Sequence, residues 1–519
     1  LAANDLLLYR ADSPQELVAD QEKFWDGALV KLARAHAALR GRDFITPDDV
    51  QAVVIPALGH RVILRPELWV RGLSGDEVVA RIYEAYTIAM SGEPGPVLVE
   101  IPVNLQLFEG EAGDLPPPPV LHQPGCDEAL ISHAADRLVA SASPGIFVGW
   151  GASDASASLI EIAELLGAPV ATSLQGVAAF PANHPLHAGF GFGPSAVPAA
   201  RDAFKTGDVM LAAGVRFGEI ATGSFGAVPP QALIHVDINP QAIGANFPAE
   251  IALPGDCRVV LPALAAALKA RLGAGNQERG QAVARTIASG KARYREEWER
   301  HDTKGRVNPA SFFDALRERL ADDAVLVADD GNHTFLAAEL MPIHAARGFI
   351  SPTDFNCMGY CVPAANAAKL ANPYRDVVAI VGDGAFLMTG LEVLTAKAMG
   401  AGIAYFVFAD GELSQISQAQ ATPYNRKTCT VLPSVKLGPW AEAVGADFVS
   451  IGTDDELADG VAAALAAARA GRPVIVEVAI DYSKPTRFTS GTVATNLKRF
   501  PLSAKVRFIG RALARKVTG

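Results

Sequence analysis

Cysteine and long apolar runs are scarce in this sequence, and each scarcity excludes a class of protein. The five cysteines are scattered over 519 residues, which excludes a disulfide scaffold and the paired CxxC spacing of a structural zinc site. No run reaches the roughly 18 consecutive apolar residues that a membrane-spanning helix needs, and no signal peptide is visible. The pattern is typical of a reduced, cytoplasmic protein with no membrane partner.

Positive charge is also scarce over most of the chain. The formal net charge at pH 7 is −11, which excludes non-specific nucleic-acid binding by the body of the protein. The C-terminal tail, residues 481–519, reverses this trend, because it is rich in lysine and arginine and has Asp481 as its single acid. Two interpretations of the tail are open: a solvated segment, or a lid over a cofactor phosphate or an anionic substrate.

Small and apolar residues are abundant instead. Half of the chain is apolar, and it contains 47 glycines and 35 prolines, which suits a soluble protein with several α/β layers. Its length suits about three ordinary domains. The first residue is Leu1 rather than methionine, which indicates a fragment or a processed chain.

Two apolar runs in the C-terminal half each end in an acid beside glycine. Residues 377–381 are followed by Gly-Asp-Gly at 382–384, and residues 403–408 are followed, after one alanine, by Asp-Gly at 410–411. The runs predict parallel strands whose carboxyl ends meet at the ligand-binding edge of an open α/β sheet. Glycine lets the backbone approach a phosphate, and the free N–H groups at a helix start attract an anion. Two carboxylates beside such a pocket suit Mg²⁺, although Gly-Asp-Gly alone also occurs in ordinary turns.

This pattern resembles the signature of the thiamine-diphosphate-dependent enzymes. The resemblance implies that thiamine diphosphate and Mg²⁺ bind here, with Asp383, Asp410 and the backbone carbonyl of Glu412 as metal ligands. It also implies cofactor contacts at three neighbouring residues: Gly382, Gly384 and Ala385. Asp410 departs from the family pattern, which usually has asparagine there. The extra charge should tighten metal binding but repel the cofactor when no metal is present.

A third apolar run ends in Asp-Asp-Gly-Asn-His at residues 329–333. In acetolactate synthase relatives the matching turn contacts the diphosphate, which implies that Gly331, Asn332 and His333 contact it here, the last two as hydrogen-bond donors. The alternative for His333 is an ordinary surface histidine at a helix start.

Residues 356–365 resemble the family turn G-x-M-G-[FY]-G-L-P-A-A, with Asn356 and Cys361 at two of its glycine positions. The match implies that Met358 is the apolar wedge that holds the cofactor bent. It also implies that the carbonyl of Asn356 and the N–H of Met358 bond to the aminopyrimidine. The alternative for Met358 is plain core filler.

Residues 125–272 alternate apolar strand patterns with helical ones, which predicts a doubly wound domain with a parallel sheet of about six strands. The segments 214–223 and 235–244 resemble the central domain of the acetolactate synthase branch. In that branch the domain often holds a FAD that does no redox work, and Gly214, Arg216 and Phe217 match such a site. The alternative is a structural turn, because relatives without flavin keep the same residues.

The N-terminal residues differ in character. Residues 1–82 are helical in pattern, and residues 28–80 resemble the lid domain of MoxR-type AAA ATPases, without the phosphate loop that an ATPase needs. Residues 83–105 resemble the closing helix and strand of the pyrimidine-binding first domain of thiamine-diphosphate enzymes. Within them, residues 97–103 predict a buried parallel strand.

The motif that carries the family's catalytic carboxylate is missing from residues 1–105. The family uses a glutamate, in an H-E-x-x-A-type helix of the first domain, to activate the cofactor, and residues 1–105 contain no such motif. The catalytic residues are therefore unknown. The chain resembles an enzyme whose first domain has been replaced, and a natural fusion, a gene-prediction artefact and a chimera are all open.

The predicted fold class is α/β, with doubly wound parallel-sheet domains after an N-terminal helical segment. In chain order the predicted parts are a helical segment 1–82, a first-domain remnant 83–105, a linker 106–124, a central domain 125–275, a helical connector 276–307, a diphosphate- and metal-binding domain 308–480 and the C-terminal tail 481–519. The resemblance implies a homo-oligomeric transferase that decarboxylates a small 2-keto acid and joins the product to a second carbonyl, with activity impaired by the missing glutamate. The rival hypotheses are a non-catalytic cofactor-binding or interaction module, and a fragment or chimera.

Overall fold

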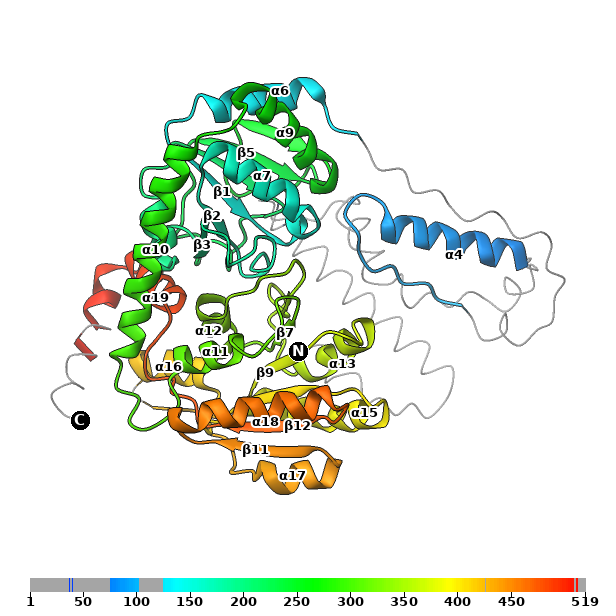
Figure 1. Ribbon diagram of the computed structural model, residues 1–519, viewed down its shortest axis with the longest axis vertical. Helices are drawn as coiled ribbons and strands as arrows, with labels where there is room; N and C mark the ends of the chain where they lie inside the picture. Colours follow the sequence, from blue (N-terminus) through cyan, green and yellow to red (C-terminus); the bar gives the residue numbers. More distant parts are fainter. Residues whose placement is uncertain are drawn as a thin grey trace. The chain divides into compact units, whose positions relative to one another are not determined.

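The computed structural model describes residues 37, 40, 75–101, 125–424, 426–507 and 510–511. The chain divides into two compact units, residues 1–88 with 96–119 and residues 89–95 with 120–519. Most of helix α4 (Gly75–Met90) lies in the first unit, and it continues without a break past residue 82 (Figure 1). None of the described helices is both long and apolar enough to cross a membrane.

The strand predicted at residues 97–103 is wrong for its described part. Residues 97–101 belong to neither sheet of the described chain, and Leu98 is 93% exposed. A buried parallel strand needs paired neighbours and helices that cover its faces. Within the described residues this segment has no paired strand, so its apolar sequence does not produce a strand.

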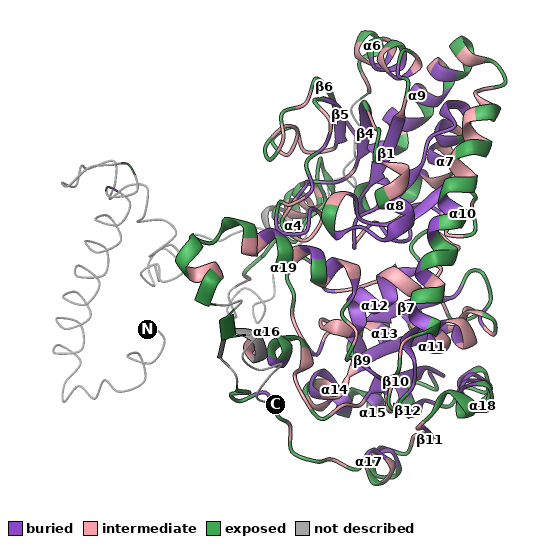
Figure 2. Cartoon of the chain, turned by 90° about the vertical axis from the view of Figure 1, so that its left-hand side faces the viewer, coloured by how far each residue is buried: buried purple, intermediate pink, exposed green. Residues whose placement is uncertain are grey.

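The second unit contains two six-stranded, all-parallel sheets, which confirms the predicted α/β fold class (Figure 1). The central sheet has the order β3-β2-β1-β4-β5-β6 and consists of β1 (Pro144–Val148), β2 (Val170–Thr172), β3 (His187–Phe190), β4 (Val209–Ala213), β5 (Ala232–Asp237) and β6 (Ile251–Pro254). Every residue of β1, β4 and β5 is buried, as expected for parallel strands covered on both faces (Figure 2).

Helices cover both faces of the central sheet. The segments around it are α6 (Glu128–Val139), η3 (Trp150–Ala155), α7 (Ser156–Leu166), η4 (Gly193–Ser195), α8 (Pro198–Ala203) and α9 (Cys257–Leu272). Successive strand residues point to opposite faces, so Ile146 and Val148 pack with α6, α7 and α9, whereas Phe147 packs with the cluster that includes α8. Asp127 begins α6 by accepting the Ala129 N–H at 2.8 Å.

The C-terminal sheet has the order β11-β12-β10-β9-β7-β8. Its strands are β7 (Val325–Ala328), β8 (Phe349–Ile350), β9 (Val377–Gly382), β10 (Ala404–Phe408), β11 (Asp447–Ile451) and β12 (Val474–Val478). From β7 the chain first adds β8 on one side and then crosses back to place β9 on the other. Open α/β sheets bind ligands at the carboxyl ends of the strands where the order reverses in this way, which here lies between β7 and β9.

The helices of this domain again form two layers. They are α11 (Pro309–Arg317), α12 (Asn332–Leu340), α13 (Cys361–Ala371), α14 (Asp383–Thr389), η5 (Gly390–Glu392), α15 (Val393–Ala398), α16 (Ser414–Tyr424), α17 (Leu437–Val444), η6 (Asp454–Glu456) and α18 (Leu457–Arg469). Helices α11, α12 and α18 bury their apolar side chains in one core cluster, and α13, α15 and α17 bury theirs in another.

The connector is the long helix α10 (Gln277–Glu299), which contacts α7 and α8 of the central domain and α11 of the C-terminal domain (Figure 1). The charged composition of residues 276–303 predicts a solvent-exposed helix, and this expectation is wrong for one face. Ile287, Gly290, Tyr294 and Trp298 are buried, because they recur at helical spacing along that face. At Gly290 a Cβ would stand 2.5 Å from the Cα of Ala199, so only glycine permits this close approach to α8.

The described part of the C-terminal tail contains helix α19 (Arg487–Arg499), which packs against both domains. The ring of Phe488 stacks on Phe335 of α12 at a centroid distance of 4.5 Å and lies 5.5 Å from Phe190 of β3. The carboxylate of the half-buried Glu339 accepts the N–H groups of Arg487 at 3.0 Å and Phe488 at 2.8 Å. This part of the tail is therefore a packed helix, which neither interpretation of the sequence included.

We expect Glu339 to make the protein less stable as the pH rises from about 4.5 to 7. Burial raises the pKa of Glu339 from 4.5 to about 7, against the effect of its hydrogen bonds with Tyr294, Phe488 and Arg487. Between these values the unfolded chain releases a proton that the folded chain keeps, so stability falls as the pH rises. Above the folded-state pKa no further loss follows.

Urea unfolding of the wild type and Glu339→Gln at pH 5, 6 and 7 measures this effect. The wild-type midpoint should fall relative to that of the uncharged glutamine variant as the pH rises. Glu318→Gln, at an exposed position after α11, is the matched control and should leave the pH profile unchanged. A difference between wild type and Glu339→Gln that does not vary with pH would contradict the expectation.

Candidate functional site

Three neighbouring strands, β10, β9 and β7, end side by side at the carboxyl edge of the C-terminal sheet. Phe408 of β10 pairs with Gly382 of β9, and Ala328 of β7 pairs with Ile380 of β9. The acidic segments that follow these strands therefore lie at one edge, at the reversal of strand order. The structure brings together the residues predicted around 329–333, 382–385 and 410–412.

Asp383, the first residue of α14, links the ends of β9 and β10. Its Oδ2 accepts the N–H groups of Gly411 at 2.7 Å and Asp410 at 3.2 Å, and its Oδ1 accepts the N–H of Gly384 at 2.8 Å. Burial raises the pKa of Asp383, and these backbone donors oppose the rise. The carboxylate is thus fixed in place by the backbone of the neighbouring strand end.

Asp410 lies close enough to Asp383 for their charges to interact. The pKa of Asp410 is raised to about 6, chiefly by burial and also by the charge of Asp383, against the hydrogen bond from Ser414, which lowers it. Two like charges at one site repel, and a divalent cation between them would remove the repulsion. Among the described residues no three His, Cys, Asp or Glu side chains form a metal cluster, so the side-chain donors at this site are the two carboxylates. Such a set suits Mg²⁺ completed by phosphate oxygens.

The side chain of Glu412 is engaged away from this pair of acids. It forms an ion pair with Lys427 and accepts a hydrogen bond from Ser417. The backbone of Glu412 forms an isolated bridge to Val431, which is held by hydrogen bonds of the residues on either side. The bridge does not use the Glu412 carbonyl, whose role as a metal ligand stays a prediction.

His333, the second residue of α12, is 4% exposed, which excludes an ordinary surface histidine. Its Nε2 is buried and has no hydrogen-bond partner in the described structure. A Cβ added to Gly331 or Gly382 would stand 2.7 Å or 3.2 Å from the Cε1 of this ring, so the two glycines leave space around it. Desolvation lowers the pKa of His333 to about 3, so the ring is neutral at pH 7.

The unpartnered Nε2 of His333 tests whether the site suits an anionic cofactor. A ring nitrogen of His333 also bonds to the backbone of Asp329, so the neutral ring can donate from Nε2 to a phosphate oxygen only in the tautomer that gives up that bond. A buried donor without a hydrogen-bond partner costs free energy, and a bound anion would supply the missing acceptor. Together with the two carboxylates for a metal, the residues present fit a magnesium diphosphate group.

Asp329 is a site residue that the sequence pattern did not mark. It is completely buried, and its carboxylate accepts the N–H groups of Asp330 at 2.9 Å, Gly359 at 3.0 Å and Cys361 at 2.8 Å. It therefore ties the end of β7 to the turn that contains Met358. The only sequence signal for this role is its place directly after an apolar run, where it is the first of two adjacent acids.

The turn that contains Asn356 and Met358 is held by both domains. Asn356 has a φ of +55° and its N–H donates to the carbonyl of Pro352 at 2.9 Å. Gln175 of the central domain donates from Nε2 to the carbonyl of Thr353 at 2.6 Å. Met358 is partly buried against the core, so one side of it is available to a neighbour. Its predicted role as a wedge stays a prediction.

The remaining predicted contacts differ in what they offer to a ligand. The Nδ2 of Asn332 donates to the Oε1 of Gln418 on α16 at 3.3 Å, so this amide group already has a protein partner. At Gly384 a Cβ would stand 2.5 Å from the Cδ2 of Leu413, so a larger residue there would have to displace the end of that side chain. Ala385 is 1% exposed within the core, which limits any ligand contact to its backbone.

The central-domain turn predicted for FAD is accounted for by packing. Phe217 is buried, has a φ of +53° and lies 5.8 Å from Phe147 between ring centroids. A Cβ on Gly149 would stand 2.2 Å from the carbonyl oxygen of Gly214, so these glycines allow the ends of β1 and β4 to meet. The described contacts of this turn are structural ones, and FAD stays a prediction.

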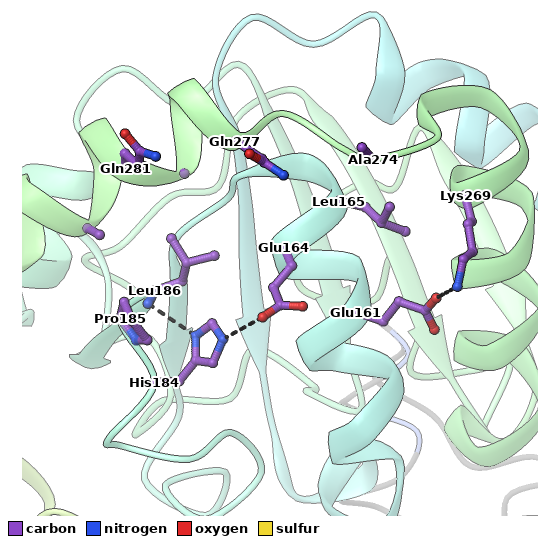
Figure 3. Close-up of a pocket in the computed structure, with 12 residues that line it drawn as sticks. Glu161, Glu164, Leu165, His184, Pro185, Leu186, Lys269, Ala274, Gln277 and Gln281 are labelled. Atoms are coloured by element: carbon purple, nitrogen blue, oxygen red, sulfur yellow. Dashed lines mark hydrogen bonds and ion pairs between the residues drawn. The ribbon is translucent and has the colours of Figure 1, made fainter.

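A shallow groove of about 590 Å³ lies on the central domain (Figure 3). None of the residues that line it belongs to the strand-end site. Its charged side chains are paired with one another. Lys269 donates to Glu161 at 3.0 Å, and the Nε2 of His184 lies 3.4 Å from Glu164. Because these groups satisfy each other on an open surface, the groove is a weaker candidate for chemistry than the strand-end site.

Three family models match parts of this chain. Residues 131–264 match the thiamine pyrophosphate enzyme central domain, and residues 329–478 match the thiamine pyrophosphate enzyme C-terminal TPP binding domain. Residues 26–82 match an AAA lid domain, in agreement with the resemblance found in the sequence.

Three curated relatives cover most of the chain. The acetolactate synthase of Mycobacterium leprae is 31% identical over 405 residues, which cover 75% of this chain and 62% of that protein. The acetolactate synthase of Mycobacterium avium is 30% identical over 453 residues, which cover 84% and 70%. The acetolactate synthase isozyme 3 large subunit of Escherichia coli K12 is 28% identical over 472 residues, which cover 88% and 79%.

These matches place the chain among the thiamine-diphosphate-dependent enzymes. Within that class it belongs to the acetolactate synthase-like family. The chain spans about 62% of the length of the Mycobacterium leprae relative.

Proposed function

We propose that this chain is the cofactor-binding part of a thiamine-diphosphate-dependent 2-keto acid decarboxylase or carboligase of the acetolactate synthase type. The observation that carries the proposal is the arrangement of Asp383 and Asp410 at the ends of adjacent strands, beside the buried and unpartnered Nε2 of His333. The family match over residues 329–478 supports it. Small 2-keto acids are the proposed substrates, and the cytoplasm is the proposed location.

Each group at the strand ends has a task in this proposal. Asp383, Asp410 and the carbonyl of Glu412 hold Mg²⁺, which neutralises the diphosphate. His333 donates to a diphosphate oxygen, and Met358 supports the bent cofactor. When bound, thiamine diphosphate supplies a group that stabilises the carbanion left by decarboxylation. The chain binds, orients and desolvates that group.

Apolar side chains beside the site indicate that a further protein surface covers it. Phe355 is 85% exposed, and Met388, Leu391 and Leu394 of the α14–α15 region are also exposed. Exposed apolar side chains that gather in one region are typical of protein interaction sites. We propose that this region receives a pyrimidine-binding domain, with its glutamate, from a different polypeptide, because residues 1–105 of this chain lack the glutamate motif. The chain itself is proposed to form a homo-oligomer.

Calorimetric titration with thiamine diphosphate, in the presence and absence of Mg²⁺, tests the binding part of the proposal. Saturable binding should appear only with the metal, and absence of binding with the metal would overturn the site. An assay for pyruvate consumption then separates the enzyme from its rival, a non-catalytic cofactor-binding module. The absence of the first-domain glutamate motif from residues 1–105 favours that rival for the chain acting alone.

Asp410→Asn is expected to keep thiamine diphosphate binding with weaker affinity for Mg²⁺, whereas Asp410→Ala should lose both. An amide oxygen can coordinate a hard cation and a methyl group cannot. Titrations with Mg²⁺ at fixed cofactor concentration measure both effects. If the asparagine variant binds as poorly as the alanine variant, the negative charge rather than the ligand oxygen is what the site requires.

Asp447→Asn is the matched control for this series. Asp447 begins β11 at the opposite, amino edge of the same sheet, and pairs with Arg472 at 2.8 Å. Its substitution removes one surface charge of the same sign without reaching the strand ends. Cofactor and metal affinities should both stay at the wild-type level.

A further inference from the structure

A second cavity, of about 230 Å³, lies between the central and C-terminal domains and shares no residue with the strand-end site. It is formed by β3, α8, α10 and α12 and by the residues after α12. Its wall is largely apolar and includes Val177, Ala188, Val197, Ala338, Leu340 and Ile343. Binding pockets of drug-sized ligands measure about 300–1,000 Å³, so this cavity suits a smaller molecule with an apolar body.

Two polar groups face this cavity without a partner of opposite charge. His187 is 8% exposed, and its Nδ1 is buried with no hydrogen-bond partner among the described residues. The ammonium of Lys291 donates to the carbonyl of Ala182 at 3.3 Å, and no ion pair of Lys291 is found in the described part of the chain. Lys291 as a whole residue is exposed, and desolvation around its amine lowers the pKa to about 8, so most of it is protonated at pH 7.

The other charged groups that line the cavity satisfy one another. Arg295 forms an ion pair with Asp314. Glu339 accepts hydrogen bonds from the hydroxyl of Tyr294 and from two backbone N–H groups at the start of α19. Desolvation, with the charge of Lys291, holds the pKa of His187 well below its usual range, so its ring is neutral. A neutral imidazole beside an ammonium can donate to an anion from Nδ1 in one tautomer.

We propose that this interdomain cavity binds a short aliphatic carboxylate, whose charged end lies between Lys291 and His187 and whose hydrocarbon body contacts the apolar wall. A carboxylate accepts both a charge-assisted hydrogen bond from the ammonium and a hydrogen bond from the imidazole. A small apolar body is favoured because the wall offers aliphatic side chains and few further polar groups. The proposal concerns a site distinct from the strand ends and does not rest on the proposed function.

Isothermal titration of the full chain with 3-methylbutanoate tests the proposal, with 3-methylbutanamide as a probe of the same shape and no charge. The carboxylate should bind with saturation and the amide should not. No binding of the carboxylate up to about 10 mM, or equal binding of the amide, would overturn the assignment.

Variants of the chain locate the bound probe. Lys291→Met keeps the apolar stem and removes the charge, and should weaken binding at least about tenfold. Lys269→Met, on α9 in the groove of Figure 3, removes a comparable charge elsewhere and should change nothing. Unchanged affinity in Lys291→Met would overturn the proposal.

Two more variants separate this cavity from other sites. Ala338→Leu fills part of the cavity and should abolish binding, provided that its thermal unfolding midpoint without ligand matches that of the wild type. If it does not fold, the result with Lys291→Met decides alone. Asp383→Ala should bind 3-methylbutanoate normally, and loss of binding there would show that the probe occupies the strand-end site instead.

Discussion

Asp383→Ala is expected to weaken thiamine diphosphate binding by at least about 100-fold, because even residues outside the first coordination shell of a metal contribute about 10–100-fold to its affinity. The residual binding should no longer depend on Mg²⁺. Asp383 and Asp410 present two negative charges to an anionic diphosphate, so only an intervening cation makes the site attractive to it. Calorimetric titration with cofactor, with and without excess chelator, measures both quantities.

The controls for this prediction come from the same strand. Asp376 precedes β9 at its amino end and pairs with Arg469 at 2.7 Å, so Asp376→Ala removes an acid without touching the carboxyl edge. It should bind the cofactor normally. Asp383→Asn keeps a hydrogen-bond acceptor for the N–H of Gly411 and therefore tests whether the alanine variant fails through a disordered loop. Full affinity in Asp383→Ala, or in the wild type with chelator, would refute the site.

Hydrogen–deuterium exchange at C2 of thiamine diphosphate bound to this chain is expected to stay close to the rate of the free cofactor. The family's activating glutamate belongs to a motif that residues 1–105 do not contain. General acid–base catalysis contributes typically about 10²–10⁴-fold, and that factor should be missing. Proton NMR after an acid quench measures the exchange, and acetolactate formation should remain at background.

A first domain that carries the H-E helix, added in trans, is expected to raise the exchange rate by the same factor. The identical domain with its glutamate changed to glutamine is the matched control, because it can cover the apolar region around Leu391 without supplying the carboxylate. Fast exchange by this chain alone would show that one of its own acids performs the role. The interpretation of the N-terminal residues as chemically silent would then be wrong.

The strand ends were predictable from sequence because their signals are local. A short apolar run that ends in glycine and an acid has few alternatives in a parallel sheet, and β9 and β10 end where the runs before Asp383 and Asp410 end. The parallel sheets follow from the alternation of strand and helix patterns. The order of the strands, which places β7 beside β9, is a long-range property that no local pattern contains.

The features that the sequence did not reveal depend on distant partners. Asp329 connects two segments only because the N–H groups of Gly359 and Cys361 donate to its carboxylate. Trp298 is buried only because α10 lies along both domains. For residues 97–101 the sequence predicted a strand that the structure does not contain. An apolar strand needs a neighbouring sheet, and the described chain offers none to this segment. In each case the deciding contact is made by residues far away in sequence.

The packing of α19 on the central domain has a consequence for how the protein is synthesised. The Nδ2 of Asn496 donates to the Oγ of Ser224 across 272 residues of sequence. Ribosomes add about 5–20 residues per second, so roughly 14 to 54 seconds separate the synthesis of these two partners. Throughout that interval the nascent central domain exposes the face that α19 later covers, where chaperones can bind. A stop codon before α19 would therefore leave part of the central domain uncovered. The residues lost in this way lie after the C-terminal domain in the sequence.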